Sequence, residues 1–301
     1  MALAPIALFV YNRPKHTIYT VESLQKNILA NESDLFIFSD APKIPSQSGL
    51  VDSVRKHIRG INGFKSVTII ERDINNGLAN SIIYGVSKLC KEFGQVVVLE
   101  DDLVTSPHFL GYMNESLNTY RYNESVISIH GYMYPIKSKL PETFFLRGAD
   151  CWGWATWDRG WDMFEKNSNK LLYGIRNKNL VNQFNYNGAF NNFKMLNDQN
   201  DGKIDAWCIR WHASAFLKNK LTLYPGVSLV NNIGNDGTGV NCGYTNYYDC
   251  EVSKHPIEIK EIAVTENEEV RKRVEEYLRN LKKPIVNRIK NKIRKFYNNY
   301  I

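Results

Sequence analysis

Short apolar runs alternate with longer amphipathic segments along the first hundred residues. The runs are rich in β-branched and aromatic residues, as strands are, and they lie at residues 6–11, 35–39, 67–71 and 96–99. In the segments between them, apolar residues recur every three or four positions, which is typical of helices; in the third segment they are Leu78, Ile82, Val86 and Leu89. The pattern predicts the order β-α-β-α-β-α-β, and therefore an α/β fold with a mostly parallel, Rossmann-like central sheet and flanking helices.

The remainder of the chain is less regular. Residues 106–265 are richer in aromatic residues and asparagine and contain short strand candidates such as Val126–His130. From residue 266 onward apolar residues again recur every three or four positions, which predicts a helical segment over 266–301. Pro284 predicts a kink in it, because proline removes a backbone donor. We therefore expect a regular first half at 1–105, an irregular second half at 106–265 and a C-terminal helical segment.

The formal net charge of +7 is concentrated in that last segment. Lysines and arginines accompany its apolar positions, and no carboxylate side chain follows Glu276. No module with interleaved basic and base-stacking residues is recognisable, so nucleic acid is not an expected partner. A basic amphipathic helix with aromatic residues near its end favours an anionic membrane surface, and the alternative is a solvated or protein-docked helix.

Cysteine usage and hydropathy indicate the compartment. The five cysteines lack the CxxC or Cys/His spacing of a metal site, and a chain of this length does not need disulfides. The apolar start lacks the basic region of a signal peptide, and no stretch reaches the roughly 18 to 20 apolar residues that cross a bilayer. We expect a cytoplasmic protein, either soluble or peripheral on the inner face of the cytoplasmic membrane.

Polar side chains follow all four predicted strands. In a parallel sheet the ligand site lies at the carboxyl ends of the strands. The residues at those ends are Asn12-Arg13-Pro14, Asp40-Ala41-Pro42, Asp73 to Gly77, and Glu100-Asp101-Asp102. Asn80 lies in the helix start that follows the third strand, and it either contacts the ligand or belongs to an ordinary turn.

The run Glu100-Asp101-Asp102 carries the strongest chemical signal. Three consecutive carboxylates after a buried strand repel one another and lose solvation unless a positive charge neutralises them. A divalent cation such as Mg²⁺ or Mn²⁺ does so, because it binds one or two carboxylates and takes further ligands from water and substrate phosphates. The alternative is a solvated acidic turn.

The segment Val96–Phe109, Val-Val-Val-Leu-Glu-Asp-Asp-Leu-Val-Thr-Ser-Pro-His-Phe, resembles the metal-binding motif of GT-A glycosyltransferases, especially the N-acetylglucosaminyltransferase I group and its bacterial relatives. Two earlier segments match in the same order. Ile6–Arg13 resembles the first strand of the group, whose terminal arginine contacts the nucleotide. Phe36–Asp40 resembles the second strand, whose aspartate contacts the uracil imide. The resemblance implies a GT-A fold and a UDP-sugar donor bound by Arg13 and Asp40.

Three later segments extend the resemblance, which covers roughly residues 5–245. Phe144–Trp154 resembles the segment that lines the donor-sugar and acceptor sites, and Asn235–Gly239 resembles the mobile loop that closes over the diphosphate. Ile204–Trp207 resembles the helix start that carries the catalytic base. This chain departs from the family there, because a single Asp205 precedes an alanine where the relatives carry paired acids.

These matches suggest roles in sugar transfer. We expect Asp102 to coordinate the metal, Asp101 to hold the ribose or a metal-bound water, and Glu100 to reach a hydroxyl of the donor sugar. Arg13 and Thr238 would donate hydrogen bonds to the diphosphate, on which negative charge develops as it leaves. Arginine suits this role because its forked guanidinium matches phosphate oxygens.

Asp205 is the leading candidate for the base, since an inverting transfer needs a carboxylate or a histidine opposite the leaving group. His212, seven residues later, is better explained as a structural histidine. Among the tryptophans that follow residue 150, Trp154 is the preferred platform for a sugar ring because it comes after Gly153, where backbone approaches a ligand closely. Core packing is the alternative for Trp154.

The sequence therefore predicts a metal-dependent inverting glycosyltransferase that uses Mn²⁺ or Mg²⁺. It would transfer a hexose or N-acetylhexosamine from a nucleotide-sugar to a saccharide or lipid-linked saccharide, in bacterial surface polysaccharide synthesis. One alternative is a sugar nucleotidyltransferase, although Tyr11–Lys15 lacks the glycine-rich loop usual after its first strand. The other is a non-catalytic nucleotide-sugar- or carbohydrate-binding relative, which would not need the acidic run.

Overall fold

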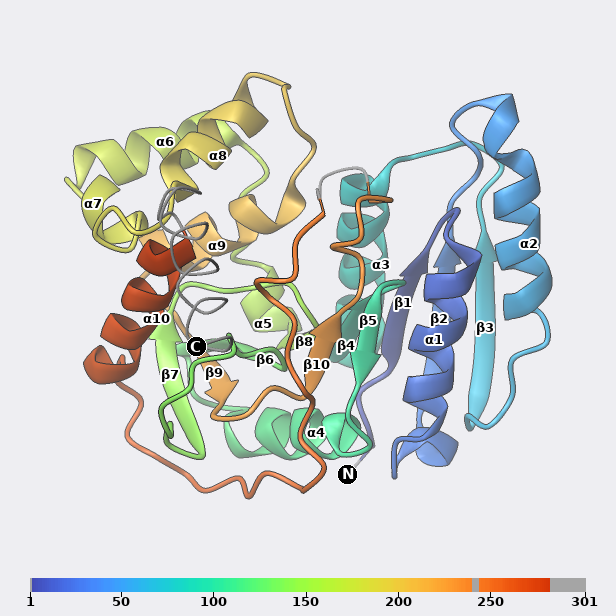
Figure 1. The fold of residues 1–301 in the computed structure, drawn as a ribbon, viewed down its shortest axis with the longest axis horizontal. Helices are drawn as coiled ribbons and strands as arrows, with labels where there is room; N and C mark the ends of the chain where they lie inside the picture. The colour runs from blue at the N-terminus through green and yellow to red at the C-terminus, as the bar shows by residue number, and fades with distance from the viewer. Residues whose placement is uncertain (1, 240–243, 282–301) are drawn as a thin grey trace, which may run out of the picture.

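The computed structural model describes residues 2–239 and 244–281 and is built around one large β-sheet (Figure 1). Its eight strands have the order β3-β2-β1-β4-β8-β6-β9-β7. Their bounds are β1 Ile6–Val10, β2 Asp34–Ser39, β3 Ser66–Glu71, β4 Gln95–Glu100, β6 Val126–His130, β7 Thr143–Arg147, β8 Trp154–Trp157 and β9 Leu221–Pro225. A separate two-stranded sheet pairs β5 (Leu103–Thr105) with β10 (Val230–Asn232).

Helices cover both faces of the sheet (Figure 1). Their bounds are α1 Pro14–Gln25, α2 Ser48–Ile58, α3 Leu78–Phe93, α4 Phe109–Thr119, α5 Asp158–Trp161, α6 Ser168–Asn177, α7 Val181–Phe184, α8 Asn192–Asn200, α9 Trp207–Leu217 and α10 Glu268–Leu281. The four predicted strands, the three helices between them and the strand at Val126–His130 are all present. The predicted α/β class, with a mostly parallel central sheet and flanking helices, is confirmed.

The alternation of side chains along the strands divides the core into two layers. Leu8 of β1 points into a cluster with residues of α1, α2 and α4, whereas its neighbour Phe9 points into a cluster with α3 and α9. This follows from the period of two in a strand, which sends successive side chains to opposite faces. β1 and β4 are buried on both faces, which explains why they are continuous apolar runs, whereas the edge strand β3 is only partly buried.

One sheet joins the two parts that the sequence separates at residue 105. β4, from the first part, pairs with β8 from the second, and Val98 lies opposite Trp154. Because β8 is antiparallel to β4, the residues just before β8 lie at the carboxyl end of β4. β6 is antiparallel to β8 and parallel to β9, so both β6 and β9 run in the direction of β4. The division of roles between 1–105 and 106–265 stays a prediction.

Helix α10 packs on the protein through the apolar face that the sequence predicts. Val270, Val274 and Leu278 are buried in a cluster with side chains of β7 and β9. For this part of the C-terminal segment, the membrane-surface interpretation is corrected to a docked helix, because the apolar face is already covered. The predicted kink at Pro284 and the rest of the basic segment lie outside the described residues. No helix in the described parts of the chain is long and apolar enough to cross a membrane.

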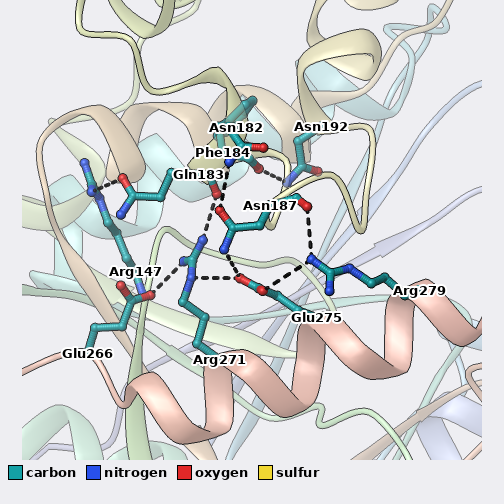
Figure 2. A network of polar contacts seen from close by, with 10 residues as sticks. All are labelled: Arg147, Asn182, Gln183, Phe184, Asn187, Asn192, Glu266, Arg271, Glu275 and Arg279. Atoms are coloured by element: carbon teal, nitrogen blue, oxygen red, sulfur yellow. Dashed lines mark hydrogen bonds and ion pairs between the residues drawn. The ribbon is translucent and has the colours of Figure 1, made fainter.

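The polar side of α10 is fixed by a buried ionic network (Figure 2). Arg271 donates hydrogen bonds to Glu266 at 3.0 Å and to the carbonyl of Gln183 at 2.8 Å, and its Nε lies 3.3 Å from Glu275. Asn187 donates to Glu275 at 2.8 Å. The network therefore joins α10 to the segment around α7, far away in the sequence.

We expect Arg271→Met to lower the free energy of unfolding by about 1–3 kcal/mol, because Glu266 and Glu275 would keep buried carboxylates that have lost their main partner. Urea unfolding followed by circular dichroism measures the change. Lys272→Met is the matched control, since Lys272 is an exposed neighbour on the same helix. Equal unfolding midpoints for the two variants would contradict a stabilising role of the network.

Candidate active site

The acidic residues at the end of β4 lie beside Arg13, which follows β1. β1 and β4 are adjacent parallel strands with Phe9 opposite Glu100, so their carboxyl ends meet. Nη2 of Arg13 donates to the carboxylate of Asp101 and, at 2.8 Å, to Oδ2 of Asp102. The structure thus brings together three predicted site residues from distant parts of the sequence, and the guanidinium bridges the two aspartates.

Burial makes this acidic group unfavourable without a cation. Burial raises the pKa of Asp101 to about 6, while Arg13 acts against the shift and Asp102 adds to it. Burial also raises the pKa of Glu100, and Asp102 and Cys208 add to that shift. One arginine therefore does not neutralise three carboxylates. The remaining negative potential suits a bound divalent cation.

The donor set fits Mg²⁺ or Mn²⁺ bound together with a substrate. Carboxylate oxygens are the hard ligands that these ions prefer, and one or two of them suffice when phosphates and water supply the rest. Asp102, with Asp101 beside it, would provide the protein's share. Within the described ranges, no three His, Cys, Asp or Glu side chains converge into a cage that would hold a metal without substrate.

Gly234 closes the site from the second half of the chain, and the sequence analysis did not single it out. Ile233 donates its backbone N–H to the carbonyl of Asp102 at 2.8 Å, at the end of the β5–β10 pairing. A Cβ atom on Gly234 would lie 2.0 Å from Oδ2 of Asp102 and 2.9 Å from Nη1 of Arg13. Only glycine allows the backbone to pass so close to the acid–arginine cluster.

The predicted phosphate loop begins next to this cluster. Asp236 lies 3.2 Å from Nε2 of His16, which is on the first turn of α1, three residues after Arg13. Thr238 is exposed, and both its backbone N–H and its hydroxyl donate to Asp236, at 3.0 and 2.6 Å. Asp236 thus holds Thr238 close to His16, beside the acid–arginine cluster. His16 is a second residue that the sequence analysis missed, because nothing in its local pattern marks it.

Asp40 follows β2 and Asn80 lies on the first turn of α3, and both contact the turn after β3. No contact joins them to the acid–arginine cluster among the described residues. The buried carboxylate of Asp40 accepts the backbone N–H groups of Ala41, Asn76 and Gly77, each at 2.9 Å. Asn80 is exposed and donates to the carbonyl of Asn76 at 2.9 Å. In this structure both residues stabilise the turn that starts α3, and their contact with a nucleotide remains a prediction.

Asp205 precedes α9, and its side chain is 60% exposed. Its Oδ1 lies 3.8 Å from Nη2 of Arg210, and its Oδ2 lies 3.6 Å from the position of a Cβ on Gly77. The carboxylate therefore faces the start of α3, at the same edge of the sheet as the strand ends. His212 is structural, as the sequence suggests, since its Nδ1 bonds the carbonyl of Ala149 at 2.8 Å.

The proposed role of Trp154 as a platform for a sugar ring is wrong. Its side chain is 0% exposed, and its ring centroid lies 5.5–5.7 Å from those of Trp161, Trp207 and Trp211. β8 is an interior strand of the sheet, and α9 covers the face on which Trp154 lies, so the ring belongs to the core. The half-buried aromatic of this segment is Trp152.

Comparisons with known proteins give only distant matches. No protein-family model matches the chain, and no curated protein does. Among solved structures, mannosyltransferase PcManGT from Pyrobaculum calidifontis in complex with GDP-Man and Mn²⁺ is 12% identical, with a TM-score of 0.33, over 45% of this chain and 39% of that one.

Two further structures are similarly distant. TarS from S. aureus is 12% identical, with a TM-score of 0.32, over 51% of this chain and 28% of its own. A UDP-glucose pyrophosphorylase complexed with UDP-glucose is 11% identical, with a TM-score of 0.36, over 74% of this chain and 90% of its own. At these values the likeness supports no assignment of substrate or residues, so the function has to be argued from the geometry of the site.

Proposed function

We propose that this protein is a metal-dependent glycosyltransferase that transfers a sugar, with inversion, from a UDP-sugar to a hydroxyl of a saccharide or lipid-linked saccharide. The observation that carries the proposal is the buried pair Asp101 and Asp102, bridged by Arg13 at the carboxyl ends of adjacent parallel strands. Such an edge is where open α/β sheets bind ligands. Assembly of bacterial surface polysaccharide and peripheral membrane association remain expectations from the sequence.

The acid–arginine cluster would stabilise the leaving diphosphate. When the bond between the anomeric carbon and phosphate breaks, negative charge develops on the phosphate oxygens, and a divalent ion supplies Lewis-acid stabilisation there. Asp102 would hold that ion, and Asp101 would orient it or the ribose. Arg13 would exchange part of its bonding from the aspartates to phosphate, where its forked donors match two oxygens. Thr238 would add a donor from the loop that carries Asp236.

Asp205 would accept the proton of the attacking hydroxyl. Its exposed carboxylate is free to contact an incoming acceptor, and its only charged neighbour among the described residues is Arg210, at 3.8 Å. One base and no enzymatic nucleophile favour direct displacement with inversion. A carboxylate in this role has to lie within hydrogen-bond reach of the reacting hydroxyl once both substrates are bound.

The connection after β1 argues against a sugar nucleotidyltransferase. β1 ends at Val10 and α1 begins at Pro14, so only three residues separate them, and none is glycine. A glycine-rich phosphate loop does not fit there. A non-catalytic sugar-binding protein, for its part, would have no need for three consecutive carboxylates at a strand end.

The proposal is tested by thermal shift and product analysis with UDP-, GDP-, dTDP- and CMP-sugars, each with Mn²⁺, Mg²⁺ or EDTA. We expect a UDP-sugar to stabilise the protein only with metal, by about 2.7 kcal/mol at a hundred times its Kd. Slow release of free UDP should accompany this binding. Release of pyrophosphate from a sugar phosphate and a nucleoside triphosphate would establish the nucleotidyltransferase instead, and no response to any donor would overturn the proposal.

A further inference from the structure

A carboxylate without a neutralising partner lies in the second half of the chain, at Asp150. The segment that contains it leads into β8, which runs antiparallel to β4 with Trp154 opposite Val98. The residues before β8 therefore reach the edge of the sheet at which β4 ends. Helices α6 to α10 gather around this end of the sheet, away from α1 and α2 (Figure 1).

The surroundings of Asp150 leave its charge uncompensated. The side chain is 36% exposed, and Oδ1 accepts the backbone N–H of Cys151 at 2.9 Å. The nearest ion-pair candidate within the described residues is Nε2 of His130, 3.8 Å from Oδ2. Burial lowers the pKa of His130 to about 4, so the imidazole is neutral at pH 7. No lysine or arginine in the described ranges pairs with Asp150.

His130 is itself an unpartnered buried polar group. Its side chain is buried, and within the described parts of the chain neither ring nitrogen has a hydrogen-bond partner. Buried polar atoms are nearly always paired in folded proteins, so an imidazole with two free nitrogens beside a free carboxylate needs an explanation. A neutral imidazole offers one donor and one acceptor, and a ligand that carries hydroxyls satisfies both.

Tyrosine rings adjoin these residues, since the ring of Tyr224 lies 5.0 Å from that of His130 and the ring of Tyr134 lies 5.5 Å from that of Tyr132. Burial, and next the negative charge of Asp150, raise the pKa of Tyr134, Tyr186 and Tyr224. These tyrosines come from the β6–β7 connection, the segment after α7, and β9. Within the described parts of the chain, none of their hydroxyls has a hydrogen-bond partner.

Trp152 adds an apolar ring two residues from Asp150. It is half-buried, and its ring meets those of Tyr132 and Tyr248 edge to face at centroid distances of 4.7 and 5.6 Å. An aromatic surface next to a free carboxylate and free hydroxyls suits a sugar ring, which has apolar C–H faces and a rim of hydroxyl groups.

We propose that Asp150, His130, Trp152 and the hydroxyls of Tyr134, Tyr186 and Tyr224 form a saccharide-binding subsite for the acceptor. The identification of the bound sugar as the acceptor rests on the proposed function. Asp150 accepts hydrogen bonds from sugar hydroxyls, which are stronger than neutral ones because the acceptor is charged. A quaternary ammonium ion fits less well, because it has no group to pair with the three hydroxyls and the imidazole.

The sheet places the subsite at the same edge as the acid–arginine cluster. Asp150 lies four residues before Trp154 of β8, which pairs antiparallel with Val98 of β4, and β4 ends at Glu100. A transfer between two bound sugars requires the donor and acceptor sites to share such an edge.

Saccharide binding is measured directly by saturation-transfer difference NMR with methyl β-D-glucopyranoside, methyl β-D-galactopyranoside and methyl N-acetyl-β-D-glucosaminide. Each is tested alone and with UDP and Mn²⁺. We expect the wild-type protein to bind at least one glycoside, and Asp150→Asn to weaken that binding at least about tenfold through loss of a charged acceptor. Asp52→Asn is the matched control, an exposed aspartate on α2.

A second variant removes one hydroxyl and nothing else. Tyr134→Phe keeps the ring and its contacts, and we expect a loss of affinity of about two- to tenfold. Tyr122→Phe is its control, because Tyr122 is 85% exposed on the surface. Equal binding by Asp150→Asn and wild type, binding of choline in preference to every glycoside, or no glycoside binding at all would overturn the subsite.

The thermal-shift screen with nucleotide-sugars distinguishes an error in the proposed subsite from an error in the proposed function. If a UDP-sugar binds with metal but Asp150→Asn weakens the binding of no glycoside, the subsite is wrong and the proposed function stands. If Asp150→Asn weakens the binding of a glycoside but no nucleotide-sugar binds, the saccharide site is supported and its role as an acceptor site is wrong.

Discussion

Replacing Asp102 with alanine is expected to reduce metal-dependent sugar transfer by about 10³-fold, since a catalytic metal contributes several kcal/mol and each 1.36 kcal/mol is tenfold in rate. The fold should survive, because Arg13 keeps its ion pair with Asp101 and Gly234 leaves space beside the shortened side chain. Circular dichroism and the thermal midpoint check that the variant is folded.

The measurement is the rate of transfer as Mn²⁺ is titrated, because a lost metal ligand also raises the concentration of metal required for half-maximal rate. Asp52→Ala is the control, as it removes an equal charge from an exposed position on α2. If Asp102→Ala retained near-normal rates and metal dependence, Asp102 would not be a metal ligand. Asp101 and Glu100 would then be the carboxylates left to examine.

The acid–arginine cluster could be predicted because its determinants are local. Each strand of the first half is a continuous apolar run with a polar residue at its end, and parallel strands bring such ends to one edge of the sheet. Arg13 and Asp101 are therefore neighbours in space wherever β1 and β4 are adjacent. The pairing of these two strands, with Phe9 opposite Glu100, supplies that condition.

Trp154 was misassigned because its environment depends on strand order. A tryptophan after a glycine has the same local pattern whether its strand is at an edge or in the interior of a sheet. β8 is inserted between β4 and β6, and α9 covers it, so the ring is buried among Trp161, Trp207 and Trp211. Only the tertiary arrangement distinguishes a ligand platform from a core residue here.

Gly234 and Asp150 were not singled out in the sequence for a related reason, although Asp150 lies in the segment Phe144–Trp154 that resembles the lining of the donor-sugar and acceptor sites. Gly234 matters only because the β5–β10 pairing returns the chain to Asp102, more than a hundred residues earlier in the sequence. The partners of Asp150 come from β6, β9 and the segment after α7, and no spacing in the sequence links them. Sites of this kind become visible when unpaired buried groups, such as the imidazole of His130, are identified in three dimensions.

Asp205→Asn is expected to retain metal-dependent binding of the donor but to lower the rate of transfer by about 10² or more, the scale usual for loss of a general base. Asparagine has the same shape and cannot take the proton from the attacking hydroxyl. Donor binding should persist because no described contact links Asp205 to Asp102 or Arg13, and its side chain is largely exposed.

Transfer under donor saturation, measured together with the thermal shift by the donor, separates the chemical step from binding. Asp201→Asn is the matched control, since Asp201 is an exposed aspartate four residues earlier that pairs with Lys203 at 2.8 Å. Undiminished transfer by Asp205→Asn would remove it from the mechanism. Asp150 would then be the next candidate, because it lies at the same edge of the sheet and no lysine or arginine among the described residues pairs with it. A fall in kcat for Asp150→Asn at saturating acceptor would identify it as the base.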